Sequence, residues 1–340
     1  MIRCLLLLLA TTTLLGCKET APQQVIVYTA LDEEFSKPIF DSFTRQTGIE
    51  VLAKFDTEST KTVGLVEAIL AERERPRCDL FWNNELLHTL RLKKEGLLRN
   101  YPSQVGAAYP ATARATDGSW HGFAARARVL IINTNLIHEA RWPKSIHDLT
   151  DTQWGSRAGI AKPLFGTTAT HAACLFAKWG EQEAQNFFLG LKRNARIMSG
   201  NKQVARAVAA GQLAFGLTDT DDAIVEIEAG HPVTIVYPDQ GEDEVGTLFI
   251  PNSLALVKGS ANSEAANKLV DFLLSSKIED RLAMGPSAQI PLHPDSEVEV
   301  RVETPQTIRG MQIDFAEAAA VWGTASEFLR DQFTVAQPAN

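Results

Sequence analysis

Residues 25–55, VIVYTALDEEFSKPIFDSFTRQTGIEVLAKF, decide the fold class of this chain. Residues 25–28 have the composition of a short β-strand, and Asp32 can cap the helix that follows. One face of that helix is apolar and carries Phe35, Ile39, Phe40 and Phe43. The helix is expected to stop near Gly48, and residues 49–55 have the pattern of a second strand. A strand, an amphipathic helix and another strand predict an α/β unit with parallel strands.

The same alternation runs through the rest of the chain. Further strands are predicted at 78–82, 128–132, 159–163, 213–217, 233–237 and 248–257, the last broken by Pro251-Asn252. Further helices are predicted at 63–70, 85–96, 168–179, 201–210 and 315–328, with others near Phe188, Leu269 and Leu282. Ser276 and Glu279 match a capping box. No Gly/Ser linker separates the halves, so the pattern predicts two α/β lobes joined by crossing strands.

The composition is that of a globular protein. Of 340 residues, 45% are hydrophobic and 22% are charged, which is too apolar for a disordered chain. The net charge of −8 argues against nucleic-acid binding, because nucleic-acid binders carry a basic surface. Four cysteines are too few for a disulfide scaffold. Cys78 and Cys174 have apolar neighbours, so we expect buried free thiols.

The N-terminus has the layout of a bacterial export signal. Arg3 supplies a positive charge, and an apolar run leads to Leu14-Leu15-Gly16-Cys17. This ending resembles a lipobox, in which the cysteine is lipidated. We expect residues 1–17 to be a lipoprotein signal peptide and residues 18–24 a polar tether. The alternative is an ordinary signal peptide with a chance cysteine. No later stretch reaches 18 uninterrupted apolar residues, so no other membrane segment is expected.

Polar residues gather where the predicted strands end, which is where open parallel sheets bind ligands. The turn Gly166-Thr167-Thr168 opens a helix, and its N–H groups and hydroxyls suit an anion. Helix capping explains any one such turn on its own. The other polar turn residues are Thr29, Asp32, Thr57, Ser59, Thr60, Asn83, Asn84, Asn201, Asp219, Thr220, Asp221 and Asp222.

Charged residues extend this candidate cleft. Asp219, Asp221 and Asp222 are either ligands for a metal or an amine, or a helix cap with solvated neighbours. Arg126 and Arg128 share one face of a β-type run. They either bind a carboxylate or phosphate in a cleft, or lie in water on an edge strand. Four of the seven histidines have no metal-binding spacing and are interpreted as incidental. These four are His88, His121, His171 and His293.

Six segments together resemble the extracellular solute-binding proteins of ABC importers, in the branch that includes ferric-iron-binding proteins. They are VIVYTALDEEFSKPIFDSFTRQTGIEV (25–51), CDLFWNNELLHTLRLKKEGLL (78–98), ARARVLIINTNL (125–136), GIAKPLFGTTATHAACLFAKWG (159–180), VARAVAAGQLAFGLTDTDDA (204–223) and PSAQIPLHP (286–294). The resemblance implies an α/β, two-lobed periplasmic-binding-protein fold (type II), with a hinge that closes over one solute. We expect lobe 1 at 25–125 plus 248–295 and lobe 2 at 126–247 plus 296–340.

The resemblance also implies ligand positions. Ferric-binding members hold iron with two adjacent tyrosines, often with a histidine near the first strand and a glutamate after the third. The corresponding positions here are Asp221 and Asp222, Asp32, and Asn84 beside Glu85, so every usual iron ligand is altered. Carboxylates are hard donors for a cation but supply no phenolate. The anion positions of the family are better kept and correspond to Phe165-Gly166-Thr167, Arg126 and Asn201.

Three functions are compatible with these residues. The leading hypothesis is a substrate-binding lipoprotein of an ABC importer that captures a small anionic or zwitterionic solute, a phosphonate or phosphate ester with or without an amine. The alternative is a protein that binds ferric iron or another metal through Asp32, Asp221 and Asp222. A remote alternative is an exported metal-dependent hydrolase, although no G-x-S-x-G, HExxH or P-loop motif occurs.

Residue roles follow from the leading hypothesis. The anion is assigned to Gly166, Thr167, Thr168, Arg126 and Asn201. The amine or metal is assigned to Asp32, Asn84, Asp219, Asp221 and Asp222, and further cleft candidates are Thr29, Ser59 and Thr60. No cofactor is required, and Fe³⁺ is a transported ligand in the alternative. The expected partners are the solute, an ABC permease in the inner membrane and a bacterial membrane that holds the lipid anchor. We expect a monomer at the periplasmic face.

Overall fold

The computed structural model describes residues 23–56 and 62–334 of the chain. The expected signal peptide with Cys17, all but the end of the 18–24 tether, and the turn residues Thr57, Ser59 and Thr60 lie outside the described residues. Within the two described ranges, no helix is long and apolar enough to cross a membrane.

Ten strands of the described ranges join in one continuous sheet. They are β1 (Gln24–Thr29), β2 (Glu50–Phe55), β3 (Leu80–Asn83), β4 (Leu98–Arg99), β5 (His121–Asn133), β6 (Ala158–Ala161), β7 (Ala195–Met198), β8 (Phe215–Asp219), β9 (Val233–Val236) and β10 (Phe249–Val257). The order is β2-β1-β3-β10-β5-β8-β6-β7, while β4 pairs with β10 and β9 with β5. β1 pairs in parallel with β2 and β3, and β6 with β7 and β8, as the alternating pattern predicts.

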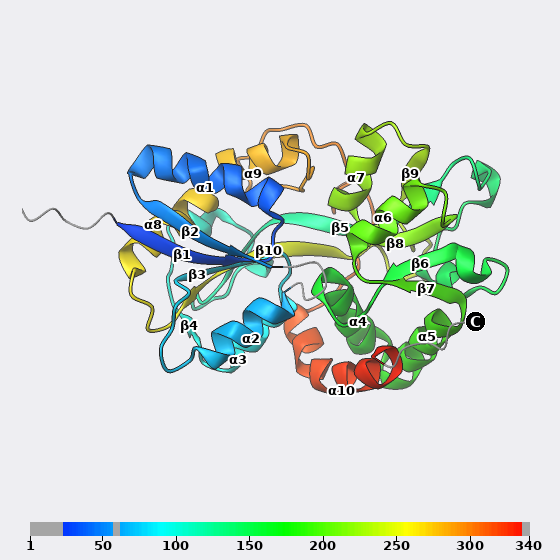
Figure 1. The fold of residues 1–340 in the computed structure, drawn as a ribbon, viewed down its shortest axis with the longest axis horizontal. Coiled ribbons are helices and arrows are strands. Elements are labelled where there is room, and N and C mark those ends of the chain that lie inside the picture. Colours follow the sequence, from blue (N-terminus) through cyan, green and yellow to red (C-terminus); the bar gives the residue numbers. More distant parts are fainter. Residues whose placement is uncertain (1–22, 57–61, 335–340) are drawn as a thin grey trace, which may run out of the picture.

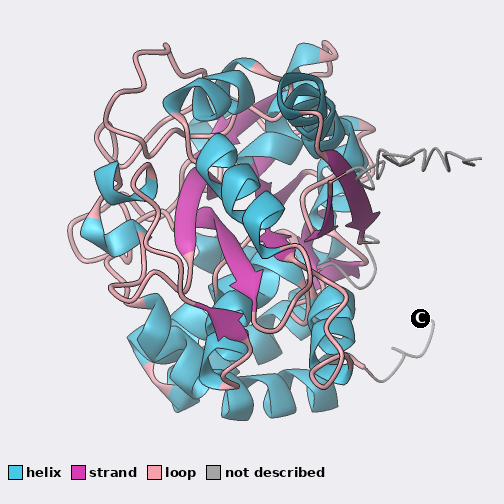
Figure 2. Ribbon diagram, turned by 90° about the vertical axis from the view of Figure 1, so that its left-hand side faces the viewer, coloured by secondary structure: helices cyan, strands magenta, loops and turns pink. Residues whose placement is uncertain are grey.

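The helices fall into two groups around this sheet (Figure 1). The first group flanks β1–β4 and comprises α1 (Glu33–Thr47), α2 (Val63–Ala71), α3 (Leu87–Lys94), α8 (Ser263–Leu273) and α9 (Ser276–Met284). The second flanks β6–β9 and comprises α4 (Gly166–Trp179), α5 (Glu181–Asn194), α6 (Asn201–Ala209) and α7 (Thr220–Glu228). The last helix, α10 (Phe315–Phe333), packs on α4 and α5 and also reaches α3. Figure 2 shows helices packed around the strands. The two groups of helices with their strands make up two α/β lobes (Figure 1).

Short 3₁₀ helices occur only in the connections of the described ranges. They are Gly106–Ala108, Ala111–Ala113, Glu139–Arg141, Ile146–Thr150 and Gly155–Arg157.

β5 and β10 connect the two lobes (Figure 1). The first half of β5 pairs with β10, and its second half, from Arg128 to Ile132, pairs with β8. The β5–β10 register shifts between Ile250 and Asn252, at the break that the sequence predicts. All residues of β5 are buried. The strand is longer than the predicted 128–132, because its alternating Ala and Arg residues lack the β-branched signature of a strand.

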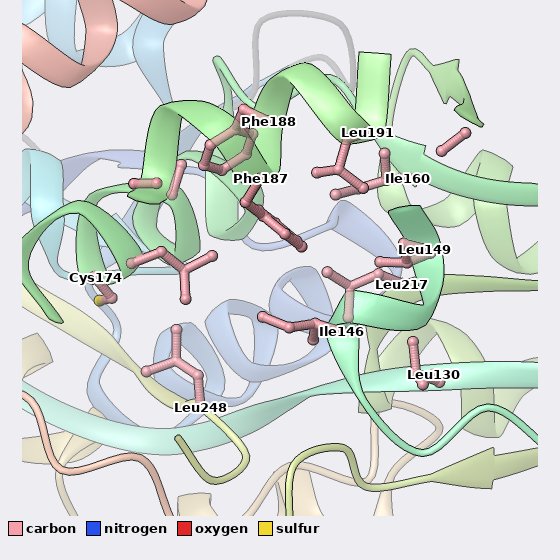
Figure 3. Close-up of a cluster of buried hydrophobic side chains, with 14 of the residues drawn as sticks. Leu130, Ile146, Leu149, Ile160, Cys174, Phe187, Phe188, Leu191, Leu217 and Leu248 are labelled. Carbon is pink, nitrogen blue, oxygen red and sulfur yellow. The ribbon is translucent and has the colours of Figure 1, made fainter. Parts of the chain in front are cut away.

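The larger apolar core lies in the second lobe, where α4 and α5 cover β6 and β8. Figure 3 shows Phe187, Phe188 and Leu191 of α5 facing the strand residues Ile160 and Leu217. The Phe187 and Phe188 rings meet edge to face, with 5.3 Å between their centroids. Burial of each such side chain contributes roughly 1.5–3 kcal/mol. This core fixes the position of α4, which carries part of the candidate site at its N-terminus.

The predicted buried free thiols are confirmed, because Cys78 and Cys174 are both buried and unbridged. Cys174 lies in the α4 core, and Cys78 lies in the core of the first lobe. Burial raises the pKa of each thiol well above its ordinary value. Both groups therefore act as small apolar side chains rather than as nucleophiles or metal ligands.

The predicted capping box of Ser276 and Glu279 is wrong. α9 does begin at Ser276, but its N-cap is Ser275, whose side chain makes no capping hydrogen bond. The Glu279 carboxylate instead accepts hydrogen bonds from the backbone N–H groups of Ala124 and of residues 292–293. The Glu279 carboxylate thus binds three backbone amides outside its own helix. These tertiary hydrogen bonds replace the capping bond that the sequence pattern predicts.

Candidate functional site

A pocket lies between the two lobes, where the N-terminal ends of α1, α4, α6 and α7 approach one another. The first lobe contributes the turn before α1 and the turn after β3, and the second lobe contributes the three other helix starts. The pocket leaves about 20 Å³ of room, which is close to the space that one water molecule needs. The lobes are therefore nearly closed on each other at this point.

Most of the candidate residues meet in this pocket. Those that line it are Asp32, Asn84, Arg126, Gly166, Thr167, Thr168, Asn201, Asp219, Asp221 and Asp222. Thr29 does not line it, because its hydroxyl accepts a 3.2 Å hydrogen bond from Leu31 N–H and supports the turn before α1. Ser59 and Thr60 lie outside the described residues. Phe165, at the anion position that the resemblance implies, also lines the pocket, and so does the cation Lys162, which the sequence interpretation missed.

Three helix starts make the second-lobe side of the pocket favourable for negative charge. The first N–H groups of a helix have no acceptor within the helix, and the helix dipole makes this end positive. Gly166 turns the chain into α4 with a φ of 53°, a left-handed conformation that suits glycine. Because α4, α6 and α7 all begin at the pocket, their effects add at one place.

One carboxylate already occupies part of this positive region. Arg128 Nη1 donates to Asp219 Oδ1 at 2.6 Å, and the Thr167 hydroxyl donates to Asp219 Oδ2 at 2.5 Å. Asn201 Nδ2 donates to the same Oδ2 at 2.9 Å. The Thr168 hydroxyl donates to Asn201 Oδ1 at 3.0 Å and orients that amide. Asp219, Arg128 and Thr167 are at most 3% exposed, so this network is buried.

Arg126 forms the second buried ion pair of the pocket. Its Nη1 lies 3.1 Å from Oδ2 of Asp221, and its Nη2 donates to Asn252 Oδ1 at 3.1 Å. The exposed fraction is 2% for Arg126 and 0% for Arg128. The edge-strand alternative for the two arginines is therefore wrong, because β5 is a central strand with neighbours on both sides. Arg126 also connects the pocket to β10, one of the two strands that cross between the lobes.

The remaining carboxylates give the pocket its acidic side. Asp219, Asp221 and Asp222 each offer an oxygen atom within 4.8 Å of the others, a spacing that can hold a cation. Asp32 faces this group from the first lobe. It occupies the N-cap position of α1, but its side chain makes no capping hydrogen bond, so the expected cap is wrong.

Lys202 ties the acidic side to the opposite lobe. Its Nζ lies 3.4 Å from Asp32 and 2.5 Å from Glu34, both at the start of α1. Burial lowers the pKa of Lys202, but Glu34, Asp32 and Asp222 raise it by more, so its net pKa lies above the ordinary lysine value. The sequence interpretation missed this residue. One feature of the sequence could have identified it. Lys202 is a cation in the first turn of a predicted helix, a position where the helix dipole disfavours positive charge.

Glu85 and His88 form a buried pair next to the pocket turn. The His88 ring lies 3.2 Å from Glu85 Oε1, and Asn83 Nδ2 donates to the same oxygen at 2.5 Å. From the other lobe, the Thr170 hydroxyl donates to Glu85 Oε2 at 2.7 Å. Burial raises the pKa of Glu85, but His88 and the hydrogen bonds lower it by more, so its net pKa lies below the ordinary value. His88 thus has a structural role here.

The family model of the "Bacterial extracellular solute-binding protein" matches residues 79–318. The chain belongs to this family. The matched range contains the pocket residues from Asn84 to Asp222 and both connecting strands. Members of the family deliver small solutes to ABC permeases.

Known relatives of this solute-binding protein differ in their ligands. It is 26% identical over 277 residues to the "Major ferric iron-binding protein" of Neisseria meningitidis serogroup A, covering 79% of this chain and 81% of the relative. It is 26% identical over 257 residues to the "Putative 2-aminoethylphosphonate-binding periplasmic protein" of Salmonella typhimurium, covering 74% and 72%. Iron-bound HitA from Pseudomonas aeruginosa has a TM-score of 0.83 at 24% identity, covering 92% and 99%. The expected two-lobed fold is confirmed, and these relatives are binding proteins.

Proposed function

We propose that this protein is the solute-binding component of an ABC importer whose pocket captures a small zwitterion, a phosphonate or phosphate ester that also carries an amine. The observation that carries the proposal is the presence of both signs of charge in one interlobe pocket. Arg126, Lys162 and the helix starts form its positive side. Asp221 and Asp222, with Asp32 opposite, form its negative side.

The anionic end of the solute lies against the start of α4. Backbone N–H groups of residues 166–168 suit phosphonate oxygens at a helix N-terminus. The Arg126 guanidinium adds a charge-assisted donor, and its buried Nε has no hydrogen-bond partner among the described residues. Lys162 adds a second positive charge to the lining. These groups supply a phosphonate with donors from two directions.

The amine lies against the carboxylates at the start of α7. Hydrogen bonds between an ammonium group and a carboxylate contribute about 1.5–3 kcal/mol each. Asp222 lies in the first turn of α7 and is partly exposed, so an arriving solute can reach it. Asp32 belongs to the other lobe, and a solute that contacts both aspartates draws the lobes together. The name of the Salmonella relative refers to a solute of this class, with a phosphonate at one end and an amine at the other.

The second candidate is ferric iron or another metal held by Asp32, Asp221 and Asp222. It is favoured by the 4.8 Å grouping of carboxylate oxygens and by the name of the Neisseria relative. Two buried arginines count against it, because they pair with Asp219 and Asp221 and add positive charge beside a trivalent cation. We propose no enzymatic activity, so the hydrolase stays a remote alternative.

We propose that the lobes, 25–125 plus 248–295 and 126–247 plus 296–340, close about β5 and β10. Ala124 lies in β5 with a φ of 42°, a strained conformation for a residue with a side chain. The N–H group of Ala124 donates a 2.5 Å hydrogen bond to the buried Glu279 carboxylate. A residue that already lies outside the ordinary β region is suited to absorb the change in φ and ψ when the lobes close. We also propose that Cys17 anchors a monomer at the periplasmic face, next to an inner-membrane permease.

A thermal-shift screen of the chain from residue 18 onward tests the proposal. The panel contains aminophosphonates, amine-bearing phosphate esters, the same anions without an amine, ferric citrate and divalent metals. A ligand at about 100 times its dissociation constant stabilises the native state by about 2.7 kcal/mol. We expect the largest shift with the amine-bearing anions. A shift with ferric iron alone contradicts the proposal and favours the second candidate.

A further inference from the structure

Asp219 differs from the other aspartates of the pocket in what its carboxylate contacts. Both of its oxygens are hydrogen-bonded to side chains of other elements, namely Arg128 on β5, Thr167 on α4 and Asn201 on α6. Asp221, by contrast, pairs with Arg126 at the pocket lining. The donors around Asp219 include the Thr167 hydroxyl and the Asn201 amide, which the sequence analysis assigned to a bound anion.

We propose that Asp219 is a tethered anion: its carboxylate fills the anion subsite formed by Arg128, Thr167 and Asn201, and so excludes a dissolved anion from it. The protein then uses Thr167 and Asn201 to hold its own side chain rather than the solute. This assignment makes Asp219 a determinant of anion specificity.

The direction of the Asp219 side chain supports this assignment. Asp219 is the N-cap residue of α7, where an aspartate ordinarily accepts a hydrogen bond from its own helix. Its side chain makes no capping bond. It turns instead toward the starts of α4 and α6, whose positive ends favour a carboxylate. The residue is 3% exposed, so three donors and little water surround its charge.

The backbone register explains why the Asp219 carboxylate reaches the Arg128 side chain. Arg128 of β5 and Asp219 of β8 are direct partners in the antiparallel ladder. The two side chains therefore emerge side by side, and the 2.6 Å contact follows from the register rather than from a mobile loop. Thr167 and Asn201 then close over the carboxylate from the two helix starts.

A filled subsite has a consequence for the solute, which rests on the proposed function. A phosphonate placed at the Thr167 hydroxyl would lie directly beside the Asp219 carboxylate, and like charges in a poorly hydrated site repel. The solute's anionic group is therefore confined to Arg126, Lys162 and the backbone N–H groups of α4. The ammonium group of the solute, in contrast, is attracted by the carboxylates of the pocket.

Chemical rescue tests the subsite without any solute. We expect Asp219→Ala in the full chain to lower the melting temperature by about 5 °C, because it leaves Arg128 buried without its counter-ion. Formate should then raise the melting temperature of this variant saturably, by about 2 °C at ten times its dissociation constant. The wild-type protein should show a much smaller formate-dependent shift, because Asp219 already fills its subsite at Arg128.

Asp239→Ala is the matched control. Asp239 is equally buried, and its carboxylate accepts from the Ser145 hydroxyl and the Ile146 N–H group. No arginine side chain contacts that carboxylate among the described residues. Its loss should destabilise the protein without formate rescue, which separates refilling of an anion subsite from a general effect of the salt.

Two results overturn the proposal: equal formate shifts in the wild type and Asp219→Ala, or no saturable shift in the variant. If Asp219→Ala does not fold, Asp219→Ser is the second variant, because its side chain is shorter and uncharged and so leaves the carboxylate position open. Formate should then stabilise Asp219→Ser more than the wild type, and equal formate responses contradict the assignment. Formate rescue together with no aminophosphonate binding keeps the subsite and removes the proposed solute.

Discussion

The hydroxyl of Thr170 in α4 donates a 2.7 Å hydrogen bond to the carboxylate of Glu85, in the turn after β3 of the other lobe. Both side chains are fully buried. The same helix presents its N-terminus to the pocket a few residues earlier. One helix therefore carries both a contact between the lobes and a large part of the proposed solute site.

Removal of this contact should cost stability. Thr170→Val keeps the shape of the side chain but leaves one donor fewer for a buried carboxylate, so we expect a loss of about 1–3 kcal/mol in the free energy of unfolding. Urea denaturation measures it. Thr134→Val is the matched control, since the exposed Thr134 hydroxyl donates to the Pro232 carbonyl at 3.0 Å. Equal losses of unfolding free energy in both variants would mean that the interlobe hydrogen bond stabilises the protein no more than an exposed one.

Glu85 should also couple stability to acid. Its folded pKa lies below the ordinary value of 4.5, so the unfolded chain binds more protons in that range. Its contribution is complete above the ordinary value and is lost as the pH falls through the lowered folded value. Glu85→Gln should therefore flatten the decline of the unfolding free energy between about pH 5 and pH 3. Urea titrations at a series of pH values measure this slope, and identical slopes contradict the assignment.

Asp222 should contribute to affinity rather than to stability. If it accepts a hydrogen bond from the ammonium group, Asp222→Asn weakens binding of an amine-bearing phosphonate by about 10- to 100-fold. The melting temperature of the unliganded protein should change little, because Asp222 is only partly buried. The exposed Asp243→Asn is the matched control. Unchanged affinity in Asp222→Asn would remove this residue from the solute site.

Lys202 should stabilise the closed lobes in a salt-dependent way. Its side chain is 28% exposed, and the Glu34 partner is 56% exposed, so solvent screens the pair. Such pairs contribute about 0.2–1 kcal/mol, which corresponds to at most about a fivefold loss of affinity in Lys202→Met. The difference should vanish at about 0.5 M salt. Lys37→Met removes a similar surface pair with Asp41, 3.2 Å away within α1, and should leave affinity unchanged at every salt concentration.

Features that depend on neighbouring residues in the chain could be predicted. α1 ends at Gly48 as expected, and Gly48 has a left-handed φ of 73°. The parallel pairing of β1 with β2 follows from the pattern of residues 25–55. The position of the polar residues at strand ends could also be predicted, whereas their meeting in one pocket between the lobes could not. These signals are local, so the sequence carries them directly.

Features that depend on strand register could not be predicted. The pairing of Arg128 with Asp219 needs the antiparallel ladder between β5 and β8, which lie 91 positions apart at this pair. Without the register, Asp219 was grouped with Asp221 as an amine or metal ligand. Glu279 was assigned to a cap for the same reason, because its contact with Ala124 spans 155 positions.

The most direct test of the central claim is a calorimetric titration of the wild-type protein with a matched pair of ligands, 2-aminoethylphosphonate and ethylphosphonate, beside ferric citrate. The proposed zwitterion site predicts binding of one 2-aminoethylphosphonate per chain, and binding of ethylphosphonate that is weaker by about 10- to 100-fold. Equal affinity for the two phosphonates, or heat with ferric citrate alone, would contradict it.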